Sequence, residues 1–134
     1  MIIMTPREAL KDAVDVRYAR VSTRAQRKTL PTQLKDVADK AKSLGYTKKG
    51  TEFSEAASGT RTDRKQLTAA IKKAVQMKRK GKSVVFLVRD IQRFSRDSFD
   101  LGFLYKFYPS LDDSLWTNDI PIVALNDNLV LSTK

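Results

Sequence analysis

The sequence predicts an α/β fold with a mainly parallel sheet of about four strands flanked by helices. Residues 14–21 alternate between the two faces of a strand, with apolar side chains recurring at every second position. Residues 84–88 form a continuous apolar run after a helical pattern, which is typical of a parallel strand buried on both faces. Apolar residues recur every three or four positions in 32–44 and 65–80, so both segments are predicted helices.

The first predicted element is a short N-terminal helix. Thr5 is suited to cap it, Pro6 to occupy its first position, and Glu8 to close a capping box. The first strand and a polar loop follow. The helix at 32–44 comes next, and Gly45 is a natural residue to end it because glycine readily adopts a left-handed backbone.

The remaining elements continue the alternation of strands and helices. A short candidate strand spans 51–56 and precedes the helix at 65–80. After the buried strand, a third helix is predicted from about 97 to 111, with aromatic side chains along one side. The last strand spans 120–125. Its Pro121 has no N–H group, so either this strand lies near an edge of the sheet or the proline is its first paired residue.

The composition limits the classes of protein to which this chain can belong. A chain of 134 residues, 41% hydrophobic and 31% charged, is typical of one globular domain with a real core. It contains no cysteine and no histidine, which excludes a disulfide framework, a thiol nucleophile, a histidine-based triad and a zinc site with nitrogen or sulfur ligands. No window approaches 18 uncharged apolar residues, and the N-terminus is a poor signal peptide. We therefore expect a cytoplasmic protein without a membrane partner.

The net charge points to an anionic partner. Lysine and arginine outnumber aspartate and glutamate by 26 to 15, which gives a net charge of +11. A positive field of this size favours nucleic acid or an anionic lipid surface. Of these two partners we expect nucleic acid.

Polar residues gather where the predicted strands end. In an open parallel sheet, ligands bind beyond the carboxyl ends of the strands. The first strand carries Arg20 and leads directly into Ser22 at that edge. Further arginines follow the next two strands, namely Arg61, Arg64, Arg89, Arg93 and Arg96. The sequence therefore predicts one serine hydroxyl surrounded by guanidinium groups from three segments.

Such a hydroxyl is suited to phosphoryl chemistry. Acyl transfer needs a strong base near the serine, and this chain has no histidine to supply one. Attack on a phosphodiester depends instead on positioning and on stabilising anionic oxygens, and the fork of an arginine matches phosphate geometry. A positive field also favours the ionised form of a hydroxyl. We expect Ser22 to be a nucleophile and the six arginines to contact phosphate.

Four motifs then resemble the catalytic domain of the serine recombinases of the resolvase/invertase type. They are YARVST at 18–23, LPTQL at 30–34, ASGTRTDRKQL at 57–67 and IQRFSRD at 91–97. They occur in the order of the family, at nearly its spacing, and the resemblance covers about residues 16–126. It implies a resolvase-like catalytic domain that acts in site-specific DNA recombination.

The resemblance also implies roles for individual residues. Ser22 matches the nucleophile that forms a 5′-phosphoserine link to DNA and frees a 3′-hydroxyl, before strand exchange and religation. Gln33 matches a glutamine near the active site, and Glu55 an acidic residue that orients its neighbours. The phosphate-binding arginines of the family match Arg20, Arg64, Arg93 and Arg96. The family needs neither a metal nor another cofactor. Its partners are double-stranded DNA and, in the full-length protein, further copies that form a dimer or tetramer.

Three features depart from the family pattern. Gln92 stands where the family usually has an aspartate, a candidate proton donor to the leaving oxygen, and glutamine cannot ionise. Arg17 occupies a position that is often small or apolar, which makes the packing of one strand face uncertain. The connection at 110–119 is longer than usual. We interpret 1–13 as an N-terminal helical extension and 14–134 as the catalytic domain, without the dimerisation helix and DNA-binding domain that follow in the family.

Simpler interpretations stay open beside these. Ser22 alone could cap a turn at a strand end, and Arg93 and Arg96 could be a solvated surface leading into a helix. At the level of function, two hypotheses remain. The first is a DNA-cleaving recombinase domain, which the presence of Ser22 together with its arginines favours. The second is a recombinase-derived DNA-binding or assembly module with impaired catalysis, which Gln92 suggests.

Overall fold

The computed structural model describes residues 4–57 and 64–133. Their centre is a five-stranded sheet of order β2-β1-β3-β4-β5. Four strands pair in parallel, namely β1 Val14–Val21, β2 Thr51–Ala56, β3 Val84–Val88 and β4 Ile122–Ala124. The fifth strand, β5 Leu129–Leu131, pairs antiparallel with β4. This confirms the α/β fold with a mainly parallel sheet. Strand β5 was not predicted from the sequence, because it has only three residues and no alternation of polar and apolar side chains.

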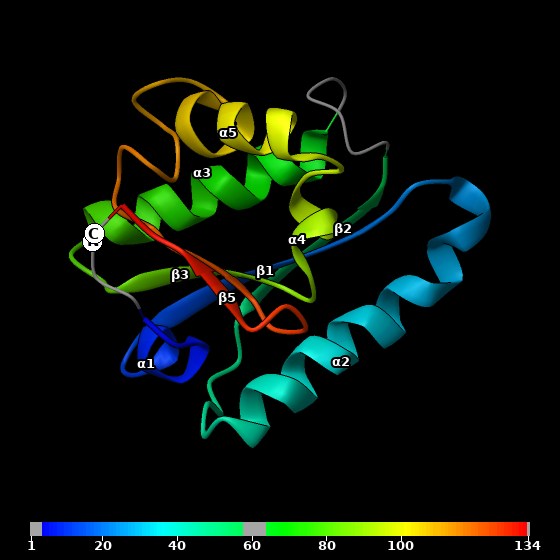
Figure 1. The fold of residues 1–134 in the computed structure, drawn as a ribbon, viewed down its shortest axis with the longest axis horizontal. Helices are drawn as coiled ribbons and strands as arrows, with labels where there is room; N and C mark the ends of the chain where they lie inside the picture. Colours follow the sequence, from blue (N-terminus) through cyan, green and yellow to red (C-terminus); the bar gives the residue numbers. More distant parts are fainter. Residues whose placement is uncertain (1–3, 58–63, 134) are drawn as a thin grey trace.

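Helices cover both faces of the sheet (Figure 1). One face carries α3 and α5, and the other carries α1 and α2, as two separate hydrophobic clusters also indicate. Short helices follow two of the strand ends. The helical segments are α1 Pro6–Leu10, the 3₁₀ helix η1 Arg24–Thr29, α2 Leu30–Ser43, α3 Lys65–Arg79, α4 Ile91–Phe94 and α5 Ser98–Phe107.

The boundaries of the predicted helices follow local chemistry. The capping box of α1 is formed, because Thr5 Oγ1 accepts from the Glu8 N–H and Glu8 accepts from the Thr5 N–H. The helix predicted at 97–111 is α5, which ends at Phe107, so its predicted extension to residue 111 is wrong. Pro109 explains the early end, because the residue before a proline is disfavoured in helical conformation.

Successive side chains of the strands point to opposite faces of the sheet and so enter different parts of the core. Val16 and Tyr18 of β1 point into the cluster beneath α3 and α5, where the Tyr18 ring lies 6.2 Å from that of Phe86. Pro121 immediately precedes β4, and its carbonyl accepts from the Phe86 N–H. Because β4 lies between β3 and β5, the proline introduces the strand and does not mark an edge.

Arg17 is accommodated by a buried polar network. Its Nε donates to Asp15 Oδ2 at 2.6 Å, and its Nη2 donates to the Lys48 carbonyl at 2.7 Å. The second carboxylate oxygen of Asp15 accepts from the Tyr46 hydroxyl at 2.6 Å. Gly50 leaves room for this carboxylate, since a Cβ there would lie 2.1 Å from Asp15 Oδ2. The charge of Arg17 is therefore paired, as a buried charge must be.

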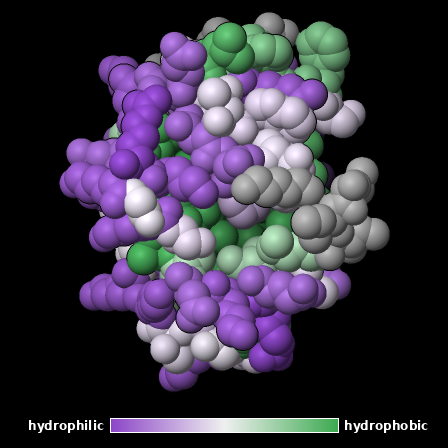
Figure 2. Space-filling view, turned by 90° about the vertical axis from the view of Figure 1, so that its left-hand side faces the viewer, coloured by the Kyte–Doolittle hydropathy of each residue, from purple (hydrophilic) through white to green (hydrophobic). Residues whose placement is uncertain are grey.

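The long connection after α5 folds back onto that helix. The Trp116 ring packs edge-on against Tyr105, with ring centres 5.9 Å apart, and the Lys106 ammonium lies 4.6 Å from the Trp116 ring centre. Trp116 therefore anchors the loop by packing. Viewed from the side of α1 and the C-terminal end of α3, the surface is mainly hydrophilic, with smaller hydrophobic areas between (Figure 2). In the part of the chain described, no helix is long and apolar enough to cross a membrane.

Candidate active site

The carboxyl ends of β1, β2 and β3 meet at one edge of the sheet. β1 ends at Val21, which pairs with Ala56 at the end of β2. β3 ends at Val88 and leads through Arg89 into α4. Since all three strands are parallel, the segments that follow them lie together, as the sequence predicted.

Ser22 lies in the bend between β1 and η1, and it is exposed. Its hydroxyl donates to Gln26 Oε1 at 2.9 Å. The same amide oxygen accepts from the backbone N–H and the hydroxyl of Thr23, both at 3.2 Å. The serine is thus presented at a strand end, and its hydrogen-bond partner is a neutral amide and not a base.

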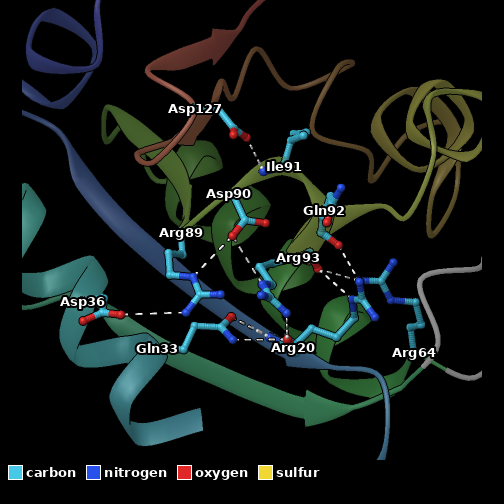
Figure 3. Close-up of polar contacts among 10 residues, drawn as sticks. All are labelled: Arg20, Gln33, Asp36, Arg64, Arg89, Asp90, Ile91, Gln92, Arg93 and Asp127. Atoms are coloured by element: carbon cyan, nitrogen blue, oxygen red, sulfur yellow. Dashed lines mark hydrogen bonds and ion pairs between the residues drawn. The ribbon is translucent and has the colours of Figure 1, made fainter. Parts of the chain in front are cut away.

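Arg20 is 5% exposed and acts as a clamp between segments (Figure 3). Its Nε donates to the Arg93 carbonyl at 3.2 Å, its Nη1 to the Ala57 carbonyl at 2.8 Å, and its Nη2 to the Gln92 carbonyl. Burial, and next the nearby Arg64 guanidinium, lower the pKa of Arg20. Arg20 therefore holds the α4 segment and the end of β2 against β1.

Arg64 is the cap residue of α3 and is 1% exposed. Its guanidinium donates to the carbonyls of Phe94 and Arg93, and at 3.0 Å to the Tyr18 hydroxyl. Its Cζ also lies 5.5 Å from the Tyr18 ring centre. Like Arg20, Arg64 therefore holds the backbone of α4 in place.

Gln33 and Glu55 also act on backbone groups. Gln33 is buried on α2, where its amide accepts from the Arg20 N–H at 3.0 Å and donates to the Arg20 carbonyl at 3.2 Å. Glu55 accepts from the Gln66 and Leu67 N–H groups, both at 3.1 Å, at the N-terminus of α3. Both side chains hold the elements that carry the arginines.

The Tyr18 hydroxyl connects Glu55 and Arg64 inside the site. It donates to Glu55 Oε2 at 2.5 Å and accepts from Arg64. Burial raises the pKa of Tyr18, the Arg64 charge opposes that effect, and the Glu55 carboxylate adds to it. The phenol therefore stays protonated and serves as a hydrogen-bond donor.

The other predicted arginines differ in exposure and pairing. Arg93 Nη1 donates to the Arg20 carbonyl at 3.1 Å, and its Nε lies 3.4 Å from Asp90 Oδ2. Arg89 forms ion pairs with Asp90 and Asp36, at 3.3 Å and 3.8 Å. Arg96 is exposed just beyond α4. Arg61 lies outside the described residues.

Gln92 faces solvent, and only its backbone carbonyl contacts Arg20. The start of α4 is held by Asp127, whose carboxylate accepts from the Ile91 N–H at 2.7 Å. Asp127 lies in the turn between β4 and β5. The short helix α4, which carries Gln92 and Arg93, is therefore held both by the buried arginines Arg20 and Arg64 and by the carboxylate of Asp127.

A groove of about 720 Å³ opens between η1, the edge strand β2 and the start of α3. Arg24 and Arg27 of η1 and Lys65 of α3 line it, together with Glu55. In a 3₁₀ helix, side chains three positions apart lie above one another, so Arg24 and Arg27 share a side. The groove is thus positively charged and lies next to the segment that begins with Ser22.

Three contributing residues were not identified from the sequence. Gln26 could have been found, because Thr23 and Gln26 have the spacing of a capping box. Asp90 could not be told apart from an ordinary helix cap. The polar role of Tyr18 was hidden by the strand pattern, which places Tyr18 on the apolar face of β1. The contacts of Tyr18 with Glu55 and Arg64 are long-range and follow from the fold alone.

Fold and site together define an α/β domain with an exposed serine and a cluster of arginines at the carboxyl edge of its parallel strands. The family model Resolvase, N terminal domain, matches residues 16–128, and the chain therefore belongs to this family of serine recombinase catalytic domains. The resemblance inferred from the four motifs is confirmed. DNA recombination is the process in which such domains act.

Solved structures support the fold assignment. The C-terminal catalytic domain of ISC1926 TnpA, an IS607-like serine recombinase, is 24% identical with a TM-score of 0.61, over 83% of this chain and 66% of that chain. The N-terminal catalytic domain of TP901-1 integrase is 22% identical with a TM-score of 0.62, over 87% and 80% of the two chains.

A resolvase family site-specific recombinase from Streptococcus pneumoniae is 20% identical with a TM-score of 0.59, over 87% of this chain and 75% of that chain. At these identities the structures show a shared fold. The comparison with curated proteins gives no match.

Proposed function

We propose that this domain cleaves and rejoins DNA through a covalent bond to Ser22. The observation that carries the proposal is an exposed serine two residues after Arg20, which belongs to a cluster of three arginines whose guanidinium groups donate to the backbone carbonyls of Arg20 and Arg93. Three positive charges held together repel one another, so the cluster favours an anion such as a DNA phosphate. The family assignment supports a DNA phosphodiester as that anion.

The reaction is a transfer of a phosphoryl group. Ser22 Oγ loses its proton and bonds to phosphorus, while the bond from phosphorus to the 3′ oxygen breaks and that oxygen takes up a proton. Religation reverses these steps with the 3′ oxygen of a new partner strand. Arginine donors that bind the anionic oxygens more tightly in the transition state lower the barrier.

The arginines divide into two roles. Arg93 and Arg96 are the more accessible ones, and we assign them to direct contact with the phosphate. Arg20 and Arg64 are buried, so we assign them to holding α4 and to contributing positive field. Gln33 and Glu55 fix the end of β1 and the start of α3. Arg61 remains a predicted phosphate contact, and Arg89 becomes one only if DNA displaces its carboxylates.

The basic groove gives the DNA strand a path next to Ser22. Arg24, Arg27 and Lys65 line it, and backbone phosphates bind such cations without a readout of base sequence. We also propose that residues 14–134 form the catalytic unit, that 1–13 is an extension of it, and that copies of the full-length protein assemble as dimers or tetramers on double-stranded DNA.

A second candidate function is a recombinase-derived DNA-binding or assembly module without cleavage. Gln92 favours it, because this position lacks the carboxyl group that could protonate the leaving oxygen. Asp90 favours it as well, if its contact with Arg93 excludes the phosphate. Both candidates predict DNA binding, and only the first predicts a covalent product.

A library of randomised DNA duplexes, each with a nick that traps the cleaved end, separates the two candidates. The full chain is incubated with the library and the products are resolved on a denaturing gel. We expect a protein–DNA adduct that carries label from the fragment whose 5′ end is at the break, and none from the fragment that ends there in a 3′-hydroxyl. Ser22→Ala should abolish the adduct and leave binding nearly intact, whereas Ser43→Ala on α2 serves as the matched control. Binding without any adduct would support the second candidate.

A further inference from the structure

A row of alternating charges connects helix α2 to the candidate active site (Figure 3). Asp36 of α2 lies 3.8 Å from Arg89 Nη1, and Arg89 Nε lies 3.3 Å from Asp90 Oδ2. The same Asp90 oxygen lies 3.4 Å from Arg93 Nε. The side chains of Arg89, Asp90 and Arg93 are only 20–26% exposed, so water screens their interaction less than at a free surface.

Two neighbours orient the guanidinium plane of Arg93. Asp90 Oδ2 lies 3.4 Å from Nε as an ion pair without a hydrogen bond, and the Arg20 carbonyl accepts from Nη1 at 3.1 Å. A guanidinium group is planar and rigid, so a hydrogen bond at one nitrogen and a negative charge beside another favour one direction for the rest of the fork. Without Asp90, one contact would remain and the plane could turn about it.

Asp90 itself is held at both its backbone and its carboxylate. It occupies the cap position of α4, whose first N–H, that of Ile91, donates to Asp127. Its carboxylate is shared between Arg89 and Arg93. Arg89 in turn reaches Asp36, which lies three residues after Gln33 on the same side of α2. Helix α2 therefore contacts the ends of both β1 and β3.

We propose that Asp90 is a positioning residue for Arg93, and that Asp36 and Arg89 keep Asp90 in place. This rests on the proposed function, in which Arg93 binds the phosphate that Ser22 attacks. The motifs that indicated the family do not include Asp90, which lies two positions before the Gln92 that departs from the pattern. The row of charges makes the orientation of α2 relative to the sheet a determinant of the cleavage rate.

The competing role for Asp90 is to occupy Arg93 in place of the phosphate. The two roles predict opposite signs for one substitution. If Asp90 positions Arg93, Asp90→Asn slows adduct formation at saturating DNA with little change in DNA affinity. If Asp90 competes with the phosphate, the same substitution tightens binding and speeds adduct formation, and the proposal is overturned.

The rate experiment uses the full chain and the DNA selected from the randomised library. We expect Asp90→Asn to slow adduct formation about tenfold, less than the loss of a direct oxyanion donor. Asp36→Asn should slow it about threefold. Asp39→Asn is the matched control, because Asp39 lies on the same helix and pairs only with exposed Lys35, at 3.7 Å. Asp90→Glu should restore part of the rate, since the charge returns.

A double-mutant cycle tests the link between α2 and Asp90. If Asp36 acts through Asp90, the double variant Asp36→Asn/Asp90→Asn should react at the rate of Asp90→Asn alone. Rates that fall by the product of the two single effects would show that Asp36 acts elsewhere, and the link to α2 would then be wrong.

Nitrogen-15 NMR of the Arg93 side chain gives a readout that does not depend on cleavage. Arg93→Lys assigns its Nε signal. We expect Asp90→Asn to shift that signal and to speed its hydrogen exchange, Asp36→Asn to do so less, and Asp39→Asn to leave it unchanged. An unaltered Arg93 signal in Asp90→Asn would overturn the proposal. If wild type forms no adduct, the proposed function fails, and the NMR result still decides whether Asp90 positions Arg93.

Discussion

Arg20 combines a buried charge with donors directed at three backbone carbonyls. A surface arginine that only bound phosphate would keep those N–H groups available to donate to the phosphate oxygens. Arg20 instead holds α4 and the end of β2 against β1, and this places the Arg93 backbone beside the end of β1. At the residue scale, one arginine of the site supports another.

The first prediction compares Arg20→Lys with Arg96→Lys. An ammonium group cannot reach three carbonyls at once, and carbonyls that lose a buried partner destabilise the fold. We expect Arg20→Lys to lower the free energy of unfolding by about 2 kcal/mol, and Arg96→Lys to leave it unchanged because Arg96 is exposed. Both should slow adduct formation about a hundredfold. Chemical denaturation measures stability, and equal stability of the two variants would contradict the clamp role of Arg20.

Gln92→Asp tests whether proton supply limits the reaction. The Gln92 side chain is exposed, so a carboxyl group there is accessible to a bound strand. We expect Gln92→Asp to raise the rate of adduct formation, since a carboxyl group can protonate the leaving oxygen and an amide cannot. Gln76→Asp, near the C-terminal end of α3, controls for the added negative charge. An unchanged rate would mean that another group or water protonates the leaving oxygen.

The elements of the site are fixed mainly at their ends. Glu55 lies in β2 and accepts from two N–H groups in the first turn of α3, where the helix dipole favours a negative charge. It also accepts from Tyr18 of β1. One carboxylate thereby joins two strands and a helix, which accounts for its orienting role.

The 3₁₀ helix η1 follows Ser22 and lines the basic groove with Arg24 and Arg27. Arg24→Gln/Arg27→Gln should weaken DNA binding and reduce the slope of log affinity against log salt by about two, one for each lost phosphate contact. Lys40→Gln/Lys42→Gln, at the exposed end of α2, is the control. A salt slope equal to that of wild type would show that DNA does not use the groove.

Glu55→Gln tests the role of the carboxylate at α3. The amide keeps one oxygen acceptor and loses the charge, so we expect a loss of about 1 kcal/mol in the free energy of unfolding. Glu52→Gln in the same strand is a matched control, because Glu52 is exposed. If both variants unfold alike in denaturant, the charge of Glu55 contributes nothing to the fold.

The elements also show what the sequence could predict. Strands β1 to β4 and helices α2, α3 and α5 follow from hydrophobic periodicity, which is local. The end of α5 was misplaced because the apolar pattern extends past Pro109 to Leu111, although the proline stops the helix. The short segments η1, α4 and β5 carry no period of their own. Helix α4 is held by Arg20 and Asp127, and β5 by its pairing with β4.

The same contrast holds for the site. Motifs placed Ser22 and the arginines at one sheet edge, because the ends of parallel strands must meet there. Burial could not be inferred in the same way. Arg20 and Arg64 turn inward, and Arg89 pairs with Asp36, because of contacts between residues far apart in the sequence. Residue identity therefore located the site, and only the fold assigned its geometry.

At the scale of the whole molecule, the net charge of +11 determines how the chain binds DNA. Arginines and lysines that contact phosphate position a strand without reading its bases. We expect weak, sequence-independent binding by this chain that falls steeply with salt, as counterion release requires. Fluorescence anisotropy across a salt series measures it. Nanomolar, sequence-selective binding that barely responds to salt would contradict the expectation.

The central claim is that Ser22 forms the covalent bond to DNA, and mass spectrometry of the trapped adduct tests it most directly. The adduct is digested with nuclease and protease, and the modified peptide is sequenced. We predict a nucleotide joined through its 5′ phosphate to Ser22, and no modified peptide from Ser22→Ala. A nucleotide attached to any other residue, or an adduct that persists in Ser22→Ala, would contradict the account.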